Sequence, residues 1–430
     1  MRCAFYEKEI TPPLGSDIPG YYKKHCADGV LDRLYAKAFV AENDGNICAI
    51  IAVDALEVQV KIHDAVIKRI REFIDIPEEN IALCATHTHM GIPVGEAYEG
   101  AEEDEEFIRI VCKLMADCVV LAYQRLEECA ISYAAGYEDS VSYNRNYVMK
   151  DGTIKTNPIW WSDDVVRPYG EIDPELPIMV VKDMSGKLKG TILSFAMHLD
   201  CIGGDKISGD YAGVISRELK KEYGEDFVSM YVAGASGDIN HINSFTPKLT
   251  MRDDYYIEAG TKLAAEAKRT IQKATPISNE VIAAKKEHII LKVRKASEKE
   301  LKDAQYLVDN PEKAERPLYA TMARQLVWFD AQNREESDVI VQIIRIGDVI
   351  FAALPGEQYS QFGLKLKEAS PTGKTVVATL CNGYCGYIPT EDLFGTAVYE
   401  VKLAAGSYLE EKAGEKILKL ATTLAEDLMK

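Results

Sequence analysis

The sequence has no uninterrupted run of about 18 apolar residues, the length that a membrane-spanning helix requires. Residues 1–9 contain no apolar segment of the kind found in secretory signals, so we expect no signal peptide. The chain also has fewer basic than acidic residues, with 50 Lys and Arg and 68 Asp and Glu, and its net charge is −18. An acidic chain is poorly suited to nucleic acid or to an anionic membrane surface. We therefore expect a cytoplasmic protein that binds no nucleic acid and does not insert stably into membranes.

Closely spaced cysteine pairs are missing as well. The ten cysteines lie mostly inside apolar runs, and Cys381 and Cys385 are spaced too widely for a CxxC metal knuckle. We interpret the cysteines as reduced residues of the core, which agrees with a cytoplasmic protein.

The chain does contain a regular succession of strand and helix patterns. The apolar runs 47–53 and 81–85 are typical of buried strands, and apolar residues recur at helical spacing over 62–74 and 107–119. The same patterns predict strands at 178–181, 191–196, 228–232, 339–346, 349–354 and 375–380, and helices at 211–223, 255–272, 298–309 and 404–429. This order predicts an α/β fold with a mixed β-sheet core flanked by helices.

No internal repeat, low-complexity tract or linker interrupts the chain, so we expect a single domain over residues 1–430. Residues 137–168 are polar, aromatic and rich in turn formers. Long irregular segments of this kind usually form a binding loop or a lid.

Polar residues follow several of the predicted strands. His87 and His89 come directly after the strand at 81–85, and residues two apart in an extended segment point the same way. Taken alone, such a pair is more often two solvated imidazoles. His198 follows the strand at 191–196 and could be a core histidine. Glu357 follows the strand at 349–354 and could cap a helix that begins near Ser360.

The polar residues that follow these strands are more informative as a group than singly. Open α/β sheets place their sites outside the carboxyl ends of their strands, so the side chains that follow the strands are expected to converge on one cleft. Two imidazoles and a carboxylate suit zinc, and three protein ligands with an open position are typical of a catalytic zinc site. The residues alone thus predict a hydrolytic metalloenzyme with its metal site at the carboxyl ends of the strands.

Several motifs, in order from one end of the chain to the other, resemble those of the neutral (alkaline, non-lysosomal) ceramidase family. They are Glu-Ile-Thr-Pro-Pro-Leu-Gly at 9–15, Leu-Asp-Arg-Leu-Tyr-Ala-Lys-Ala at 31–38, Thr-His-Thr-His at 86–89, Asn-Arg at 144–145, Phe-Ala-Met-His at 195–198, Ile-Ser-Gly-Asp at 207–210, Pro-Gly-Glu at 355–357, Tyr387, and Tyr-Glu at 399–400. The match spans nearly the whole chain.

The resemblance implies a zinc ion held by four residues, namely His87, His198, Glu357 and Tyr387. It also implies that His89 handles protons beside the metal, and that Arg145 and Tyr399 bind or polarise the substrate carbonyl, which gains charge in the transition state. The expected reaction is hydrolysis of an amide (N-acyl) bond, or of an ester, by metal-activated water.

The sequence departs from the family pattern at Asn240, where the family has a serine that is important for activity. An amide cannot act as an alkoxide nucleophile, but it can donate a hydrogen bond to an oxyanion. A covalent serine route is therefore disfavoured, whereas attack by water is retained and Asn240 becomes a candidate for the site. The neighbouring His241 is an extra imidazole that we interpret as a loop histidine rather than a second acid–base group.

Two further departures concern the substrate. Residues 90–93 and 199–201, beside His89 and His198, differ from the family pattern, which predicts a remodelled pocket. We also expect no immunoglobulin-like C-terminal domain of the kind that the authentic ceramidases have. We therefore expect a small N-acyl or O-acyl substrate, with both a sphingolipid and a soluble compound such as an acylated sugar left open.

Two alternatives to a zinc-dependent amidase stay open. One is a carbohydrate-directed esterase or deacetylase that uses the same metal site. The other is a catalytically degenerate binding protein, which Asn240 would suit. The presence of all four candidate ligands together with Arg145 and Tyr399 favours an enzyme.

Overall fold

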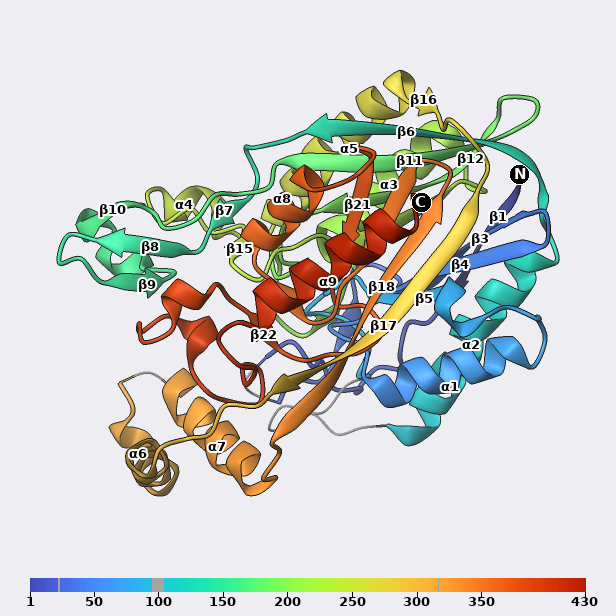
Figure 1. The fold of residues 1–430 in the computed structure, drawn as a ribbon. Coiled ribbons are helices and arrows are strands. Elements are labelled where there is room, and N and C mark those ends of the chain that lie inside the picture. Colours follow the sequence, from blue (N-terminus) through green and yellow to red (C-terminus); the bar gives the residue numbers. More distant parts are fainter. Residues whose placement is uncertain (22–23, 95–103, 316) are drawn as a thin grey trace.

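The computed structural model describes residues 1–430 except 22–23, 95–103 and 316 (Figure 1). Within these residues the largest element is a mixed sheet of nine strands, in which β16 (Thr275–Pro276) pairs with β6. The order of its other strands is β14 (Val228–Ala233), β12 (Leu188–Phe195), β11 (Glu175–Asp183), β6 (Glu127–Tyr137), β1 (Arg2–Glu9), β3 (Tyr35–Asn43), β4 (Asn46–Val53) and β5 (Ile81–Ala85). Strand β4 is parallel to β5 and β12 is parallel to β14, whereas the neighbours between them are antiparallel.

A second sheet packs face to face on the first. It contains, in order, β17 (Ile282–Lys292), β18 (Glu336–Ile346), β19 (Val349–Ala353) and β21 (Thr375–Ala378). β18 and β19 form a hairpin, which turns at Gly347 with a φ of 65°, a conformation that glycine adopts without strain. β19 and β21 are parallel, so this sheet is mixed as well.

Alternation of side chains along the strands explains the layers. In β3, Phe39 belongs to a buried cluster shared with Ile344 of β18, whereas Val40 belongs to a cluster shared with Val111 of α2. Strand β3 therefore buries one face between the two sheets and the other face under helices, as the period of two requires.

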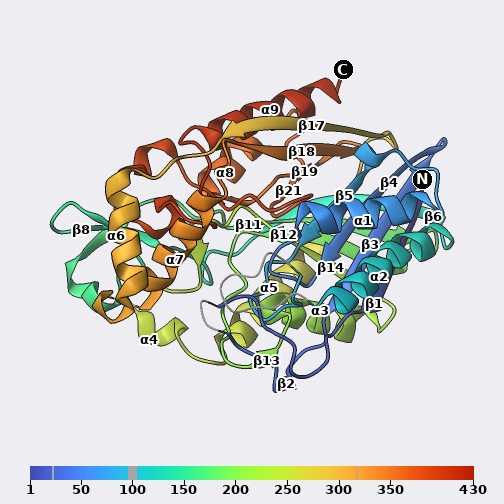
Figure 2. The same ribbon diagram turned by 90° about the horizontal axis from the view of Figure 1, so that it is seen from below.

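Helices cover both outer faces (Figure 2). The outer face of the nine-stranded sheet is covered by α1 (Val60–Arg71), α2 (Glu105–Tyr123), α3 (Asp210–Tyr223) and α5 (Tyr255–Lys273). The outer face of the four-stranded sheet is covered by α8 (Ser360–Glu368) and α9 (Ala413–Asp427). The prediction of a mixed sheet core flanked by helices is confirmed.

Other sequence predictions need correction. The segment 137–168 is not irregular, because it contains a three-stranded sheet of β10 (Val165–Pro168), β8 (Asn146–Met149) and β9 (Ile154–Thr156). The last helix begins at Ala413 rather than near residue 404.

All ten cysteines are free and all but Cys26 are buried, as expected. Among the described residues, we find no helix with both the length and the apolar character needed to cross a membrane.

A helical hairpin interrupts the second sheet between its first two strands. It consists of α6 (Glu298–Asp309), which the sequence predicts, and α7 (Pro317–Ala331), which it does not. The two helices pack on each other through Ala304, Ala323 and Leu326, and they project beyond the end of the two sheets (Figure 1). Residues of α7 line two cavities near the candidate metal centre.

Helices α3 and α5 lie close to each other at Gly260. A Cβ added there would lie 2.5 Å from the Cβ of Val214 and 2.8 Å from the backbone oxygen of Tyr211. We predict that Gly260→Ala lowers the free energy of unfolding by about 1–3 kcal/mol, because the helices must move apart.

The matched control is Gly213→Ala on α3, where an added Cβ meets nothing nearer than 3.5 Å. There the better helix propensity of alanine is expected to stabilise the protein by up to about 1 kcal/mol. Urea unfolding measures the change in the free energy of unfolding, which should be a decrease for Gly260→Ala and an increase for Gly213→Ala. Equal changes in the two variants would contradict the packing argument.

Candidate metal centre

His87 and His89 reach the centre from a turn rather than from a strand. Strand β5 ends at Ala85, and His87 has a φ of 72°, which is uncommon for a residue other than glycine. The prediction that both side chains share one strand face is therefore wrong about the backbone. The two rings nevertheless lie together, with 5.0 Å between their centroids. Strained backbone held in place by its surroundings is typical of functional sites.

Backbone carbonyl groups orient these two imidazoles. Nδ1 of His87 lies 2.8 Å from the carbonyl oxygen of Leu56, and Nδ1 of His89 lies 3.0 Å from that of Gly20. A proton on each Nδ1 leaves Nε2 with a free lone pair. Nδ1 hydrogen bonds of this kind are usual for metal-binding histidines.

His198 follows the end of β12. Its Nδ1 lies 2.8 Å from the carbonyl oxygen of Ser236, and its ring centroid lies 4.7 Å from that of His87. One ligand atom from each of His87, His89 and His198 lies within 4.8 Å of the others. The structure therefore brings together three histidines that are separated by up to 111 positions in the sequence.

Glu357 and Tyr387 are brought together by strand pairing. Glu357 opens β20 (Glu357–Gln358), which runs parallel to β22 (Tyr387–Ile388), and the two residues are partners in the register. Oε2 of Glu357 lies 3.4 Å from Nε2 of His87 and 3.1 Å from Nε2 of His198. The ring of Tyr387 stacks on that of His198 at 6.4 Å. All four predicted ligands thus meet at one place.

The residues present fit a divalent metal ion. Nε2 of His87, Nε2 of His89 and Oε2 of Glu357 are buried and have no hydrogen-bond partner among the described residues. Buried polar atoms without partners are costly, and a cation between them would satisfy all three. Two imidazoles and one carboxylate form a common donor set for zinc. Either His89 or Glu357 could complete the set begun by His87 and His198.

Electrostatics favour the protonation states that bind a metal. Burial opposes ionisation of Glu357, but the two neighbouring imidazoles outweigh it and hold the pKa of this carboxyl well below its usual value. Burial and the charge of His87 lower the pKa of His89 to about 4. Burial and the nearby guanidinium of Arg145 also lower the pKa of His198. His87 differs, because the charge of Glu357 overcomes burial and raises its pKa.

Arg145 lies against this cluster and is itself buried. Its Nε donates to Glu400 over 2.5 Å and its Nη2 donates to the carbonyl oxygen of Gly237 over 2.6 Å. The guanidinium lies 5.1 Å from the ring centroid of Tyr387 and 5.9 Å from that of Tyr399. The predicted pair of Arg145 and Tyr399 is therefore beside the predicted ligands.

Glu400 is a residue of this centre that sequence reasoning missed. It is fully buried, and its second oxygen accepts a hydrogen bond from Thr156 at 3.1 Å. Its only signal in the sequence is its place after Tyr399, since a single glutamate carries no pattern. By neutralising Arg145, it keeps the guanidinium charge beside the histidines without leaving a buried charge unpaired.

Asn240 and His241 have hydrogen-bond or ion-pair partners outside the histidine cluster. Nδ2 of Asn240 donates to Oδ1 of Asn157 over 3.1 Å, and His241 lies 3.2 Å from Asp200 and packs on Tyr255. Neither residue lines the cavity at the histidines in the described part of the chain. The interpretation of His241 as a loop histidine agrees with this position, whereas the role of Asn240 as an oxyanion donor stays a prediction.

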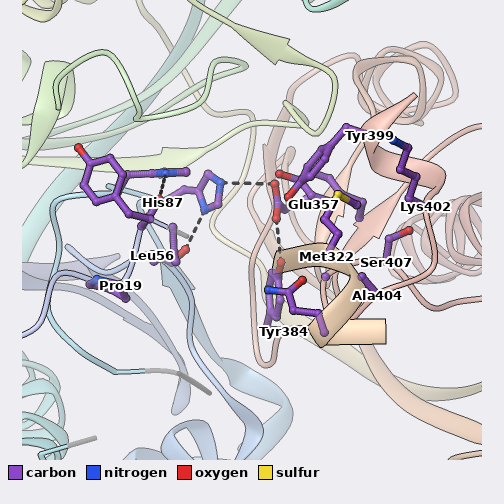
Figure 3. A pocket seen from close by; sticks show the side chains of 16 residues that line it. Pro19, Leu56, His87, Met322, Glu357, Tyr384, Tyr399, Lys402, Ala404 and Ser407 are labelled. Carbon is purple, nitrogen blue, oxygen red and sulfur yellow. Dashed lines mark hydrogen bonds and ion pairs between the residues drawn. The ribbon is translucent and has the colours of Figure 1, made fainter. Parts of the chain in front are cut away.

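The cavity at the histidines has a volume of about 60 Å³ (Figure 3). Its walls include five predicted residues, which are His87, His89, Glu357, Tyr387 and Tyr399. They also include residues that the sequence did not indicate. Tyr384 donates a hydrogen bond to Oε1 of Glu357 over 2.9 Å, and Met322 and Gln325 reach the cavity from α7.

The chain is similar in sequence to a known protein family. The family model for "Neutral/alkaline non-lysosomal ceramidase, N-terminal" matches residues 8–335. Neutral ceramidases from Drosophila melanogaster and Drosophila pseudoobscura pseudoobscura are each 24% identical to this chain over 259 residues. These alignments cover 56% of this chain and 36% of each fly protein, so the chain matches only part of the length of these relatives.

Solved structures agree with this assignment. A crystal structure of neutral ceramidase from Pseudomonas aeruginosa superposes with a TM-score of 0.76 at 18% identity and covers 99% of this chain and 74% of that one. A ceramidase complexed with C2 gives a TM-score of 0.76 at 17% identity and covers 100% of this chain and 75% of that one. These matches show a shared fold. Because the family model spans most of the sequence, the resemblance is confirmed, and the chain belongs to the neutral/alkaline non-lysosomal ceramidase family.

Proposed function

We propose that this protein is a zinc-dependent hydrolase that cleaves the amide bond of an N-acyl substrate. The observation that carries the proposal is the meeting of His87, His198 and Glu357 around buried atoms that have no hydrogen-bond partner among the described residues. Family membership supports amide cleavage, because the relatives are named ceramidases and ceramide is an N-acyl amine.

In this proposal the metal is held by His87, His198, Glu357 and Tyr387. A zinc ion bound there would supply Lewis-acid chemistry, by polarising the carbonyl group and lowering the pKa of water. Glu357 contributes the negative charge that offsets part of the charge of the cation. Tyr384 holds the other oxygen of Glu357, which fixes the orientation of the carboxylate.

His89 is the residue that we assign to proton transfer. Burial keeps its imidazole neutral at pH 7, since its pKa is lowered to about 4. Its Nδ1 is directed to the carbonyl oxygen of Gly20, so its buried Nε2 offers a lone pair to the cavity. That atom can accept a proton from the attacking water and then deliver it to the leaving nitrogen.

Arg145 and Tyr399 stabilise the charge that develops on the carbonyl oxygen. A fixed guanidinium in a buried site stabilises an oxyanion better than a mobile one, because its orientation is set before the reaction. Glu400 acts through Arg145 and is a positioning residue, since it holds the Nε edge and leaves the remaining edge directed toward His198.

Hydrolysis of a panel of N-acyl and O-acyl substrates by the purified protein tests this function directly. We expect release of a free amine from at least one N-acyl substrate, loss of that activity after treatment with a chelator, and its return when zinc is added. Amide hydrolysis that is insensitive to chelators, or activity on esters alone, would overturn the proposal.

Removal of a proposed ligand is predicted to release the metal. His87→Ala and Glu357→Ala should reduce bound zinc from about one ion per chain to about one tenth of that, because each change removes one of the three imidazole and carboxylate donors of the proposed site, and these are the groups that zinc binds most readily besides thiolates. Metal analysis of protein prepared without chelators measures this, and circular dichroism confirms that the fold is intact. His288→Ala removes an exposed imidazole of β17 that pairs with Asp338, and it should retain full zinc content.

Glu400→Ala is predicted to be strongly destabilising. The substitution leaves the guanidinium of Arg145 buried without its partner, which costs about 3–5 kcal/mol of unfolding free energy. Glu218→Ala removes the partner of Lys221 from a surface pair on α3 and should cost less than about 1 kcal/mol. Chemical denaturation compares the two variants. Similar losses in both would show that Glu400 does not hold a buried charge.

A further inference from the structure

The cavity at the histidines is too small to hold a substrate. Its volume of about 60 Å³ is well below the range of about 300–1,000 Å³ that is usual for sites that enclose a whole small molecule. The reactive carbonyl group can enter it, but the rest of any N-acyl substrate must lie elsewhere. The neighbouring space therefore decides which substrate fits.

A second cavity of about 620 Å³ adjoins the first, and we call it the side cavity. The two cavities share Gln325 of α7 and Tyr384. The walls of the side cavity come from α7, from the segment between α7 and β18, from the start of β18, from the segment before α1, and from residues 384, 405 and 408. Its volume lies within the range of small-molecule sites, which is about 300–1,000 Å³. A substrate whose carbonyl group lies at the histidines would thus place its larger part here.

The charged groups of the side cavity are balanced in sign. Glu57 and Asp338 carry negative charge, and Arg324 and Arg334 carry positive charge. A strongly anionic or cationic ligand would meet as much repulsion as attraction there. A long alkyl chain is equally unsuited, because it would cover charged groups that need water or hydrogen bonds. The balance favours a neutral ligand that is rich in hydrogen-bonding groups.

The remaining walls of the side cavity combine amides with aromatic rings. Nε2 of Gln59 donates to Glu57 and Nε2 of Gln332 donates to the carbonyl oxygen of Trp328, and each amide keeps a second N–H and its oxygen. Trp328 and Tyr384 offer flat apolar surfaces. Tyr408 is fixed by a stacked contact with Phe329 at 4.9 Å. Hydroxyl groups around the edge of a ring and C–H groups on its faces match such a surface. This is the chemistry of a sugar.

Gln325 lies between the side cavity and the cavity at the histidines. It is only 8% exposed, it lines both cavities, and its Nε2 has no hydrogen-bond partner among the described residues. A buried amide donor without an acceptor is costly unless a ligand supplies one. The donor is therefore placed to bind an oxygen atom of the substrate next to the bond that is cleaved.

We infer that the side cavity binds the amine half of the substrate as a neutral, polyhydroxylated ring, and that Gln325 donates a hydrogen bond to it. The substrate class is an N-acylated amino sugar. This inference rests on the proposed amide hydrolysis, in which one water adds to the acyl carbon, the C–N bond breaks, and a carboxylic acid and a free amino sugar are released. A proton passes to the leaving nitrogen.

The first experiment compares N-acetylglucosamine with N-acylsphingosine in detergent micelles as substrates of the zinc-loaded protein. We expect kcat/KM to be at least about tenfold higher for the sugar amide. Gln325→Leu should raise KM for the sugar about tenfold or more, because a site built to hydrogen-bond a substrate loses much affinity without that bond. Gln305→Leu on the neighbouring helix α6, where the side chain donates to Asp309 at the surface, is the matched control and should change nothing.

A second measurement does not depend on turnover. Trp328 lines the side cavity and is one of three tryptophans, so binding of N-acetylglucosamine should change the tryptophan fluorescence of the wild-type protein. Trp328→Phe should abolish that change. Gln325→Leu should weaken the apparent binding, and Gln305→Leu should not.

The outcomes separate this inference from the proposed function. Cleavage of N-acylsphingosine without binding or cleavage of the sugar would overturn the inference and leave the amide hydrolase standing. Trp328-dependent binding of the sugar without cleavage of any amide would support the side cavity and overturn the hydrolase. Equal behaviour of Gln325→Leu and Gln305→Leu would overturn the role of Gln325.

Discussion

The carboxylate of Glu357, buried between the imidazoles of His87 and His198, is the interaction on which the centre depends. A buried negative charge is tolerated only when nearby groups compensate it. His87 does so, since its pKa is raised, whereas burial and the guanidinium of Arg145 disfavour the charged form of His198. The arrangement is satisfied best when a cation lies between the three side chains. Other features of the centre orient these groups, through Tyr384 on the carboxylate and carbonyl groups on each Nδ1.

The position of this centre follows from how the two sheets meet. His87 comes after β5 of the nine-stranded sheet, whereas Glu357 comes after β19 of the second sheet. Direct backbone hydrogen bonds join the sheets at this edge, from the amide of Ala85 to Leu380 and from that of Thr379 to Ala233. The carboxyl ends of strands from both sheets therefore open into the same space. Ligands that are far apart in the sequence meet because the sheets themselves are held together there.

Much of the fold and the centre could be predicted from the sequence. Buried strands such as 81–85 and amphipathic helices such as 211–223 have strong local patterns, and the motifs around His87, His198, Glu357 and Tyr387 pointed to the residues that the structure gathers. The backbone at His87 could not be predicted in this way, because a positive φ at a histidine depends on tertiary contacts.

Other features lacked a local signal. Glu400 is important through its partner Arg145, which lies 255 positions away, and no pattern in a single sequence indicates that pairing. Helix α7 buries residues on more than one side, against α6 and at the two cavities, so it has no clear apolar stripe. The small sheet within 137–168 is built from strands of three or four residues, which are too short for an alternation to be recognised.

The proposed metal ligands and the residues that we expect to bind the substrate lie in different parts of the fold. The substrate specificity can therefore change while the metal site stays the same. The proposed ligands lie at the edge of the two packed sheets, whose cores leave little freedom for substitution. Part of the side cavity is built by α7, which belongs with α6 to an insertion between β17 and β18. Substitutions on the surface of α7 can alter what the cavity accepts without moving His87 or Glu357. Gln325 is the point of contact between the two parts, because it alone of the α7 residues lines both cavities in the described part of the chain.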